Sequence, residues 1–246
     1  LELLGLVLSR RLVEDAVPQG TTIVGWLMLD DFSRWLGYGK GDMADILAVA
    51  IDRNGQNPTL RLLVIESKYV GEVDVAGQAR KSAQQLIATV EGLRGKLVGD
   101  NDGLGLSLRR ERLAQLLLEH VKPFNDLMDQ GRADWLQQLR DGSADIAIAG
   151  LSAVFVHGSD DPSDVRDVDD AASTQLFISR SNIRRLVASL TSTAPTPLSI
   201  ELPNLFGLPV GARAEGETER ERGPMEQADP VDGPAVLVLE QESRTP

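Results

Sequence analysis

The sequence contains no cysteine and only two histidines among its 246 residues. The absence of cysteine excludes disulfides, thiolate metal sites and cysteine nucleophiles, so metal chemistry in this protein would have to use carboxylates. Aromatic residues make up 4% of the chain, and the three tryptophans are too dispersed to predict a base-stacking surface. No apolar run reaches the roughly 18 residues needed to span a bilayer. We therefore expect a soluble, cytoplasmic protein.

The chain has little positive charge, and its formal net charge is −12. Residues 211–246 hold nine acidic and four basic residues, so they contribute −5 and the remaining 210 residues carry −7. A domain that grips nucleic acid by itself through a broad basic surface is not expected from this balance, because such binding depends on neutralising phosphates. The chain begins at Leu1 without a methionine, and we expect it to be a piece of a longer protein.

Apolar periodicity and turn residues predict a mixed order of helices and strands. Helices are expected over residues 3–13, 79–97, 106–119 and 123–140, strands over 21–29, 44–52, 60–70 and 144–156, and a further strand or helix over 175–190. The acidic stretch from Asp160 to Asp170 predicts a solvated loop. This order favours one α/β domain over residues 1–192, followed by a flexible, proline-rich, acidic linker over residues 193–246.

The stretch LRLLVIESKYV, Leu60–Val70, carries a carboxylate and an ammonium inside an otherwise apolar run. Side chains alternate between the faces of a strand, so Glu66 and Lys68 share one face with Leu60, Leu62 and Val64. A turn over residues 53–58 predicts an antiparallel hairpin, which would bring Asp45 beside Glu66. Two adjacent carboxylates bind a proton or a hard cation such as Mg²⁺, and an ammonium beside them could orient or deprotonate an attacking water.

Asp45, followed after twenty residues by Glu66-Ser67-Lys68 and then by a helix, resembles the PD-(D/E)xK nuclease superfamily. The proline of the family name is not matched, because Ala44 precedes Asp45. The resemblance implies a restriction-endonuclease-like fold, a mixed central sheet flanked by helices. It also implies that Asp45 and Glu66 hold Mg²⁺, with Mn²⁺ as an alternative, and that Lys68 lies at the attacking water.

Some members of this family add a glutamine in the helix after the lysine, and Gln78 or Gln85 would match it. An acidic residue of the first helix often assists, and Glu2 and Glu14 are the candidates. The resemblance thus implies a metal-dependent DNA endonuclease or exonuclease. We expect it to be a module of a larger bacterial restriction or antiviral defence protein, with further domains or an ATP-driven translocase as partners and no membrane.

Other interpretations of the same residues stay open. Glu66 and Lys68 could be a solvated, mutually paired Glu and Lys on an edge strand. A nuclease-like fold could also be catalytically inactive and serve as an interaction or scaffold domain, with Glu66 and Lys68 paired for a structural purpose. Alternatively, the carboxylates could serve a hydrolase of another phosphate ester. The arrangement of the site distinguishes these interpretations, because a nuclease needs Asp45, Glu66 and Lys68 to converge with room for a cation.

Overall fold

The computed structural model describes residues 2–17, 21–33, 43–52, 59–98, 103–120, 132–161, 163–168, 170, 172–191 and 205–206. Contacts divide the chain into residues 1–211 and residues 212–246, and all described residues belong to the first unit. The predicted turn over residues 53–58 and nearly all of the predicted linker over residues 193–246 therefore lie outside the described residues.

A six-stranded mixed sheet forms the centre of the described fold, as predicted. Its spatial order is β1-β2-β3-β4-β6-β5. The strands are β1 (Thr21–Met28), β2 (Ile46–Asp52), β3 (Thr59–Val70), β4 (Ile146–Val156), β5 (Asp164–Asp167) and β6 (Ser173–Ser179). β1, β2 and β3 are antiparallel neighbours, β3, β4 and β6 run parallel, and β5 pairs antiparallel with β6. The expected β2–β3 hairpin pairing is confirmed.

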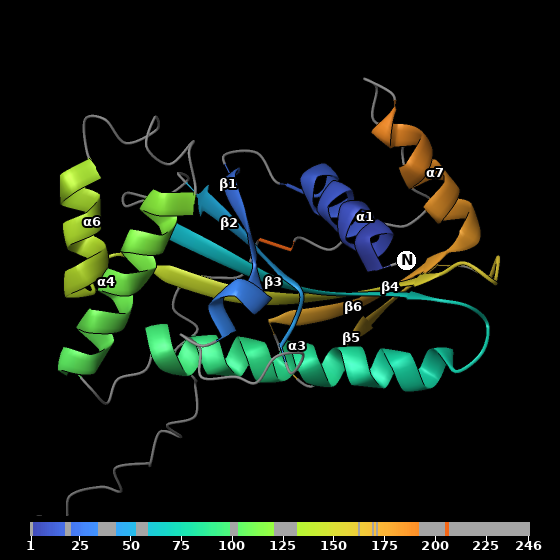
Figure 1. The fold of residues 1–246 in the computed structure, drawn as a ribbon, viewed down its shortest axis with the longest axis horizontal. Helices are drawn as coiled ribbons and strands as arrows, with labels where there is room; N and C mark the ends of the chain where they lie inside the picture. Colours follow the sequence, from blue (N-terminus) through green and yellow to red (C-terminus); the bar gives the residue numbers. More distant parts are fainter. Residues whose placement is uncertain are drawn as a thin grey trace, which may run out of the picture. The chain divides into compact units, whose positions relative to one another are not determined.

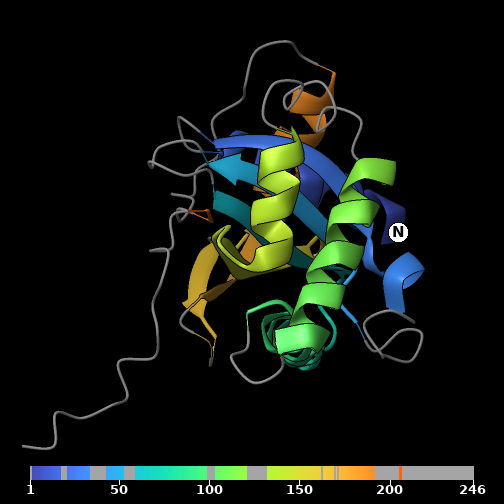
Figure 2. The ribbon, with the colours of Figure 1, turned by 90° about the vertical axis from the view of Figure 1, so that its left-hand side faces the viewer.

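Helices cover both faces of this sheet (Figure 1). Helix α3 (Val75–Leu97) lies along one face, whereas α1 (Glu2–Asp15) and α7 (Arg180–Leu190) cover the other. Helices α4 (Gly103–His120) and α6 (Arg132–Asp141) pack side by side at one end (Figure 2). The short 3₁₀ helix η1 (Leu29–Phe32) follows β1. The α/β class and the flanked mixed sheet are thus as the sequence predicts.

Strand β3 is buried on both faces, because it lies in the middle of the sheet. Leu60, Leu62 and Val64 pack toward α3, and the alternate residues Leu63 and Ile65 pack toward α1 and α7. The apolar surface that these side chains remove from water stabilises the fold by about 25 cal/mol per Å². β3 pairs with β2 over Thr59–Ile65 and with β4 over Leu60–Val70, so Glu66 and Lys68 lie just beyond the pairing with β2. Glu66 is buried rather than solvated, and it pairs with Lys68.

Two predicted segments differ from the structure. The acidic stretch expected to be a loop contains β5, which pairs with the outer edge of β6 through its backbone. Its sequence, Asp164-Val165-Arg166-Asp167, has only one apolar residue and therefore lacks the usual pattern of a strand. Residues 175–190, expected to be one element, are β6 followed directly by α7. Within the described residues, no helix has the length and hydrophobicity that a membrane crossing requires.

Candidate active site

The hairpin of β2 and β3 brings Asp45 next to Glu66. The pairing of Ile46 with Ile65 continues by one step, since the Asp45 N–H donates to the Ile65 carbonyl at 3.1 Å. The Asp45 carboxylate then accepts a hydrogen bond from the Ser67 N–H, at 2.8 Å from Oδ2. The two carboxylates are close enough for the charge of Asp45 to raise the pKa of Glu66. The predicted convergence of the two carboxylates is present in the structure.

Glu66 is a charged group in a completely buried position, with 0% of its side chain exposed. Lys68 forms an ion pair with Glu66 Oε1, and 23% of the Lys68 side chain remains exposed. Glu66 Oε2 has no hydrogen-bond partner in the part of the chain that the structure describes. Burial, and then the neighbouring charge of Asp45, raise the pKa of Glu66 to about 7, although Lys68 and Lys81 act in the opposite direction.

The pKa of Asp45 is raised as well, first by burial and further by the charges of Glu2 and Asp30. The Ser67 N–H and the Lys68 ammonium oppose this rise. Glu2, in the first turn of α1, therefore acts through its charge on Asp45. The alternative, Glu14, lies near the other end of α1 and pairs with Arg10 at 2.8 Å.

Asp30 was not among the residues predicted from the sequence. It lies in η1, and the N–H of the preceding Leu29 donates to the Asp45 carbonyl at 2.9 Å. Asp30 is exposed, and its charge contributes to the raised pKa of Asp45. An acidic pair at the end of β1, the strand that pairs with β2, is the feature of the sequence that could have indicated it.

Helix α3 presents one flank to the carboxylate pair. Thr89 Oγ1 accepts a hydrogen bond from the N–H of Ala44, the residue before Asp45, at 3.0 Å. Gln85 precedes Thr89 by four residues and Gln78 precedes Gln85 by seven, so both glutamines lie on the flank of Thr89. Gln78 makes no side-chain hydrogen bond to either carboxylate among the described residues. Both Gln78 and Gln85 therefore remain candidates for the glutamine that some members of the family have in this helix.

Lys81 is a second residue that the sequence reasoning missed. It is exposed on α3, four residues before Gln85 and three after Gln78, and its charge lowers the pKa of Glu66. The adjacent Ser82 lies directly over Ser152 of β4, the register partner of Glu66, with 2.7 Å between the two Oγ atoms. Lys81 is thus held at the level of Glu66, and its helical spacing from the two glutamines could have indicated it.

A buried polar row continues from Glu66 across the sheet. Glu66, Ser152 and Gln175 are register partners on β3, β4 and β6. Gln175 Nε2 donates to Ser152 Oγ at 2.8 Å and to the Ala79 carbonyl of α3 at 2.9 Å. These bonds fix α3 on the sheet beside the carboxylate pair. No short-range pattern could have revealed the row, since its members are far apart in the sequence.

The carboxylate pair fits a hard divalent cation. Glu66 offers a buried oxygen without a hydrogen-bond partner among the described residues, and its raised pKa means that a cation could replace a proton there. The described residues contain no group of three or more histidine, aspartate or glutamate side chains placed to hold a metal. Asp45 and Glu66 would therefore be the protein ligands, as Mg²⁺ often takes one or two carboxylates with water and phosphate oxygens.

Comparison of the chain with protein-family models, curated proteins and solved structures finds no match. Functional inference for this protein therefore depends on its motif and on the geometry of the site.

Proposed function

We propose that this protein is a Mg²⁺-dependent nuclease of the PD-(D/E)xK type that hydrolyses phosphodiester bonds in DNA. The observation that carries the proposal is the pair of Asp45 and Glu66, drawn together on adjacent strands with raised pKa values and with Lys68 beside them. Perturbed carboxylates of this kind concentrate at functional sites. Residues 1–210 carry net negative charge, which disfavours binding of DNA phosphates by this chain alone. We therefore expect other domains or a translocase to hold the DNA.

The residues present have distinct roles in this reaction. A bound Mg²⁺ supplies a water of lowered pKa and neutralises charge on the phosphate. Asp45 and Glu66 would hold the cation, and Lys68 would orient the attacking water or accept its proton. The water oxygen forms a bond to phosphorus while the bond to the leaving oxygen breaks, and the leaving oxygen takes up a proton. Glu66 ionises most readily above pH 7, so cation binding should strengthen as the pH rises past 7.

The test is cleavage of supercoiled plasmid and of linear duplex by the purified chain in Mg²⁺ or Mn²⁺, with an EDTA control. Glu66→Gln and Asp45→Asn should each lower the rate on the order of 100- to 1,000-fold, because each removes a cation ligand. Glu91→Gln is the matched control, since Glu91 is exposed elsewhere on α3 and its replacement changes net charge equally. Cleavage that survives in both site variants would refute the assignment.

A catalytically inactive scaffold is the second candidate, and one observation favours it. Glu66 is completely buried and paired with Lys68, as a purely structural ion pair would be. Calorimetric titration with Mg²⁺ separates the two functions, because a structural pair binds no cation. Binding that disappears in Glu66→Gln supports the nuclease, whereas absence of binding at pH 8 in the folded chain supports the scaffold.

A further inference from the structure

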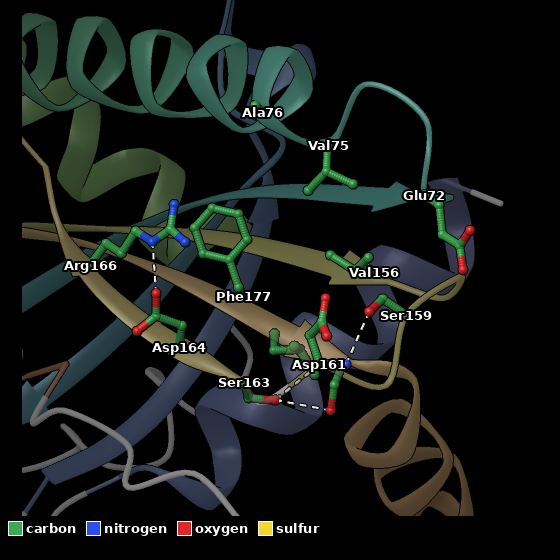
Figure 3. Close-up of a pocket in the computed structure, with 12 residues that line it drawn as sticks. Glu72, Val75, Ala76, Val156, Ser159, Asp161, Ser163, Asp164, Arg166 and Phe177 are labelled. Carbon is green, nitrogen blue, oxygen red and sulfur yellow. Dashed lines mark hydrogen bonds and ion pairs between the residues drawn. The ribbon is translucent and has the colours of Figure 1, made fainter.

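A pocket lies beyond the ends of β4 and β6, on the flank of α3 away from Asp45. Its volume is about 740 Å³, within the usual range of ligand pockets, roughly 300–1,000 Å³. Val75, Val156 and Phe177 form an apolar wall, and Glu72, Asp161 and Asp164 supply carboxylates. Figure 3 shows the three apolar side chains and the Asp161 carboxylate directed toward the same space.

The carboxylates of the pocket are only partly neutralised. Asp164 pairs with Arg166 at 2.7 Å. Glu72 and Asp161 form no ion pair within the part of the chain that the structure describes. Arg180 is paired with Asp160 at 2.5 Å, and the charge of Glu72 also contributes to its raised pKa. The pocket therefore retains an excess of negative charge beside an apolar wall.

The Arg166 guanidinium is a cation that already binds at this pocket, through an aromatic ring and a carboxylate. It lies over the Phe177 ring, 4.2 Å from the ring centroid, while its Nε pairs with Asp164 (Figure 3). A cation over an aromatic face next to a carboxylate is a favourable arrangement. A ligand with a cationic head and an aliphatic stem would find carboxylates at Asp161 and Glu72 and apolar contact along Val75 and Val156.

The position of β5 indicates how such a side chain would be presented. Within the described residues, β5 pairs with β6 alone and forms an edge of the sheet. An extended peptide can add to an edge strand through backbone hydrogen bonds, and its alternate side chains then lie on one face. Asp164 and Arg166 of β5 line the pocket, so side chains of an added strand on that face would lie at its rim.

We infer that this pocket and the β5 edge together bind a basic, extended segment of a partner polypeptide, whose arginine or lysine side chain enters the pocket. The inference does not depend on the proposed nuclease activity. It assigns a role to the acidic segment of residues 158–170, which the carboxylate pair does not use.

The test is calorimetric titration of the full chain with an acetylated, amidated Val-Arg-Val peptide. The same peptide with citrulline in place of arginine keeps the shape without the charge, and spermidine represents a free polyamine. The arginine peptide should bind about 10-fold more tightly than the citrulline peptide, because a charge-assisted pair is lost in the latter. Equal binding of both peptides would overturn the inference, and binding of spermidine without the arginine peptide would overturn the polypeptide assignment.

Variants locate the binding. Asp161→Asn and Glu72→Gln should each weaken it about 5- to 10-fold by removing a carboxylate, and Ala76→Phe should abolish it by filling the pocket. Glu91→Gln, which changes net charge by the same amount far from the pocket, should leave it unchanged. These positions are exposed, and circular dichroism checks that each variant is folded. Equal weakening by Glu91→Gln would show general attraction to an acidic chain and would overturn the inference.

Discussion

Helix α3 separates two acidic regions that differ in how their carboxylates are held. On one flank, Asp45 and Glu66 are drawn together from adjacent strands, and burial raises both pKa values. On the other side, Asp160 is exposed, and the hydrogen bond from Arg180 lowers its pKa. Asp170 is intermediate, because burial alone would raise its pKa, but hydrogen bonds from Arg94 and Ser173 lower it. The direction of each pKa shift is therefore set by burial and by the hydrogen-bond partner of the carboxyl group, not by the number of acidic residues nearby.

The two regions therefore contribute to stability with opposite dependence on pH. A carboxyl with a raised pKa binds protons more tightly in the folded state, so its contribution falls as pH rises from 4.5 to about 7 for Glu66. A carboxyl with a lowered pKa, such as Asp170, contributes above its unfolded value of 3.8, and this contribution is lost as pH falls. In the first region, ionisation of the buried carboxylates has a free-energy cost that a bound cation would relieve, whereas Asp160 and Asp170 of the second region are already paired with Arg180 and Arg94.

The largest expected effect is the stabilisation produced by Glu66→Gln, which removes the cost of an ionised buried group. The difference between 4.5 and about 7 corresponds to about 3 kcal/mol in the free energy of unfolding. Urea denaturation should show this gain at pH 8 and no gain below pH 4.5, where glutamate is protonated in both states. A variant that is less stable than the parent at pH 8 would contradict the raised pKa.

Gln175→Leu should destabilise the fold by about 2 kcal/mol, because it leaves the buried Ala79 carbonyl and one Ser152 bond without their donor. Gln84→Leu is the matched control, because Gln84 is exposed to solvent on α3. This substitution should be close to neutral. Denaturation in urea measures both. An equal loss in the two variants would show that the polar row does not anchor α3.

Lys81→Gln should weaken DNA binding in Ca²⁺ about 3- to 10-fold, as loss of one phosphate contact does. Arg80→Gln removes the same charge from the neighbouring exposed position, which helical geometry turns away from the flank of Gln78 and Gln85. Fluorescence anisotropy of labelled duplex compares the two variants. If Arg80→Gln weakens binding as much as Lys81→Gln, the flank toward Glu66 has no special role.

The smallest expected effect is that of Asp160→Asn. Its pair with Arg180 is exposed on both sides, and such pairs contribute little because water and salt screen them. Urea denaturation at pH 7 should not distinguish this variant from the parent. A clear loss of stability would show that the acidic region of residues 158–170 is held more rigidly than its exposure indicates.

Local patterns predicted much of the fold and the centre of the site. The alternation in β3 and the hairpin to β2 are short-range features, so the convergence of Asp45 and Glu66 followed from the sequence. The 3.6-residue apolar period likewise located α3. These elements are specified by neighbours in the chain, and tertiary contacts did not override them.

Features that depend on distant pairing could not be predicted in the same way. β5 is a strand because β6 offers it an edge, although Val165 is its only apolar residue. The contacts of Ser152 and Gln175 with α3 require the parallel order β3-β4-β6, which the sequence does not display. Asp30 acts on Asp45 only because η1 places it there. In each case the cause is a neighbour in space that is remote in the chain.

The order of pairing across β3 sets the order in which the site matures during synthesis. β2 precedes β3 directly, whereas β4 follows only after α3, α4 and α6 have been made. A growing chain can therefore join Asp45 to Glu66 early, but contacts of high sequence separation form later and more slowly. Ser152 lies beside Glu66 in the register, so it can cover that side of Glu66 only after β4 has been made. The surroundings that raise the pKa of Glu66 are therefore complete only late in synthesis.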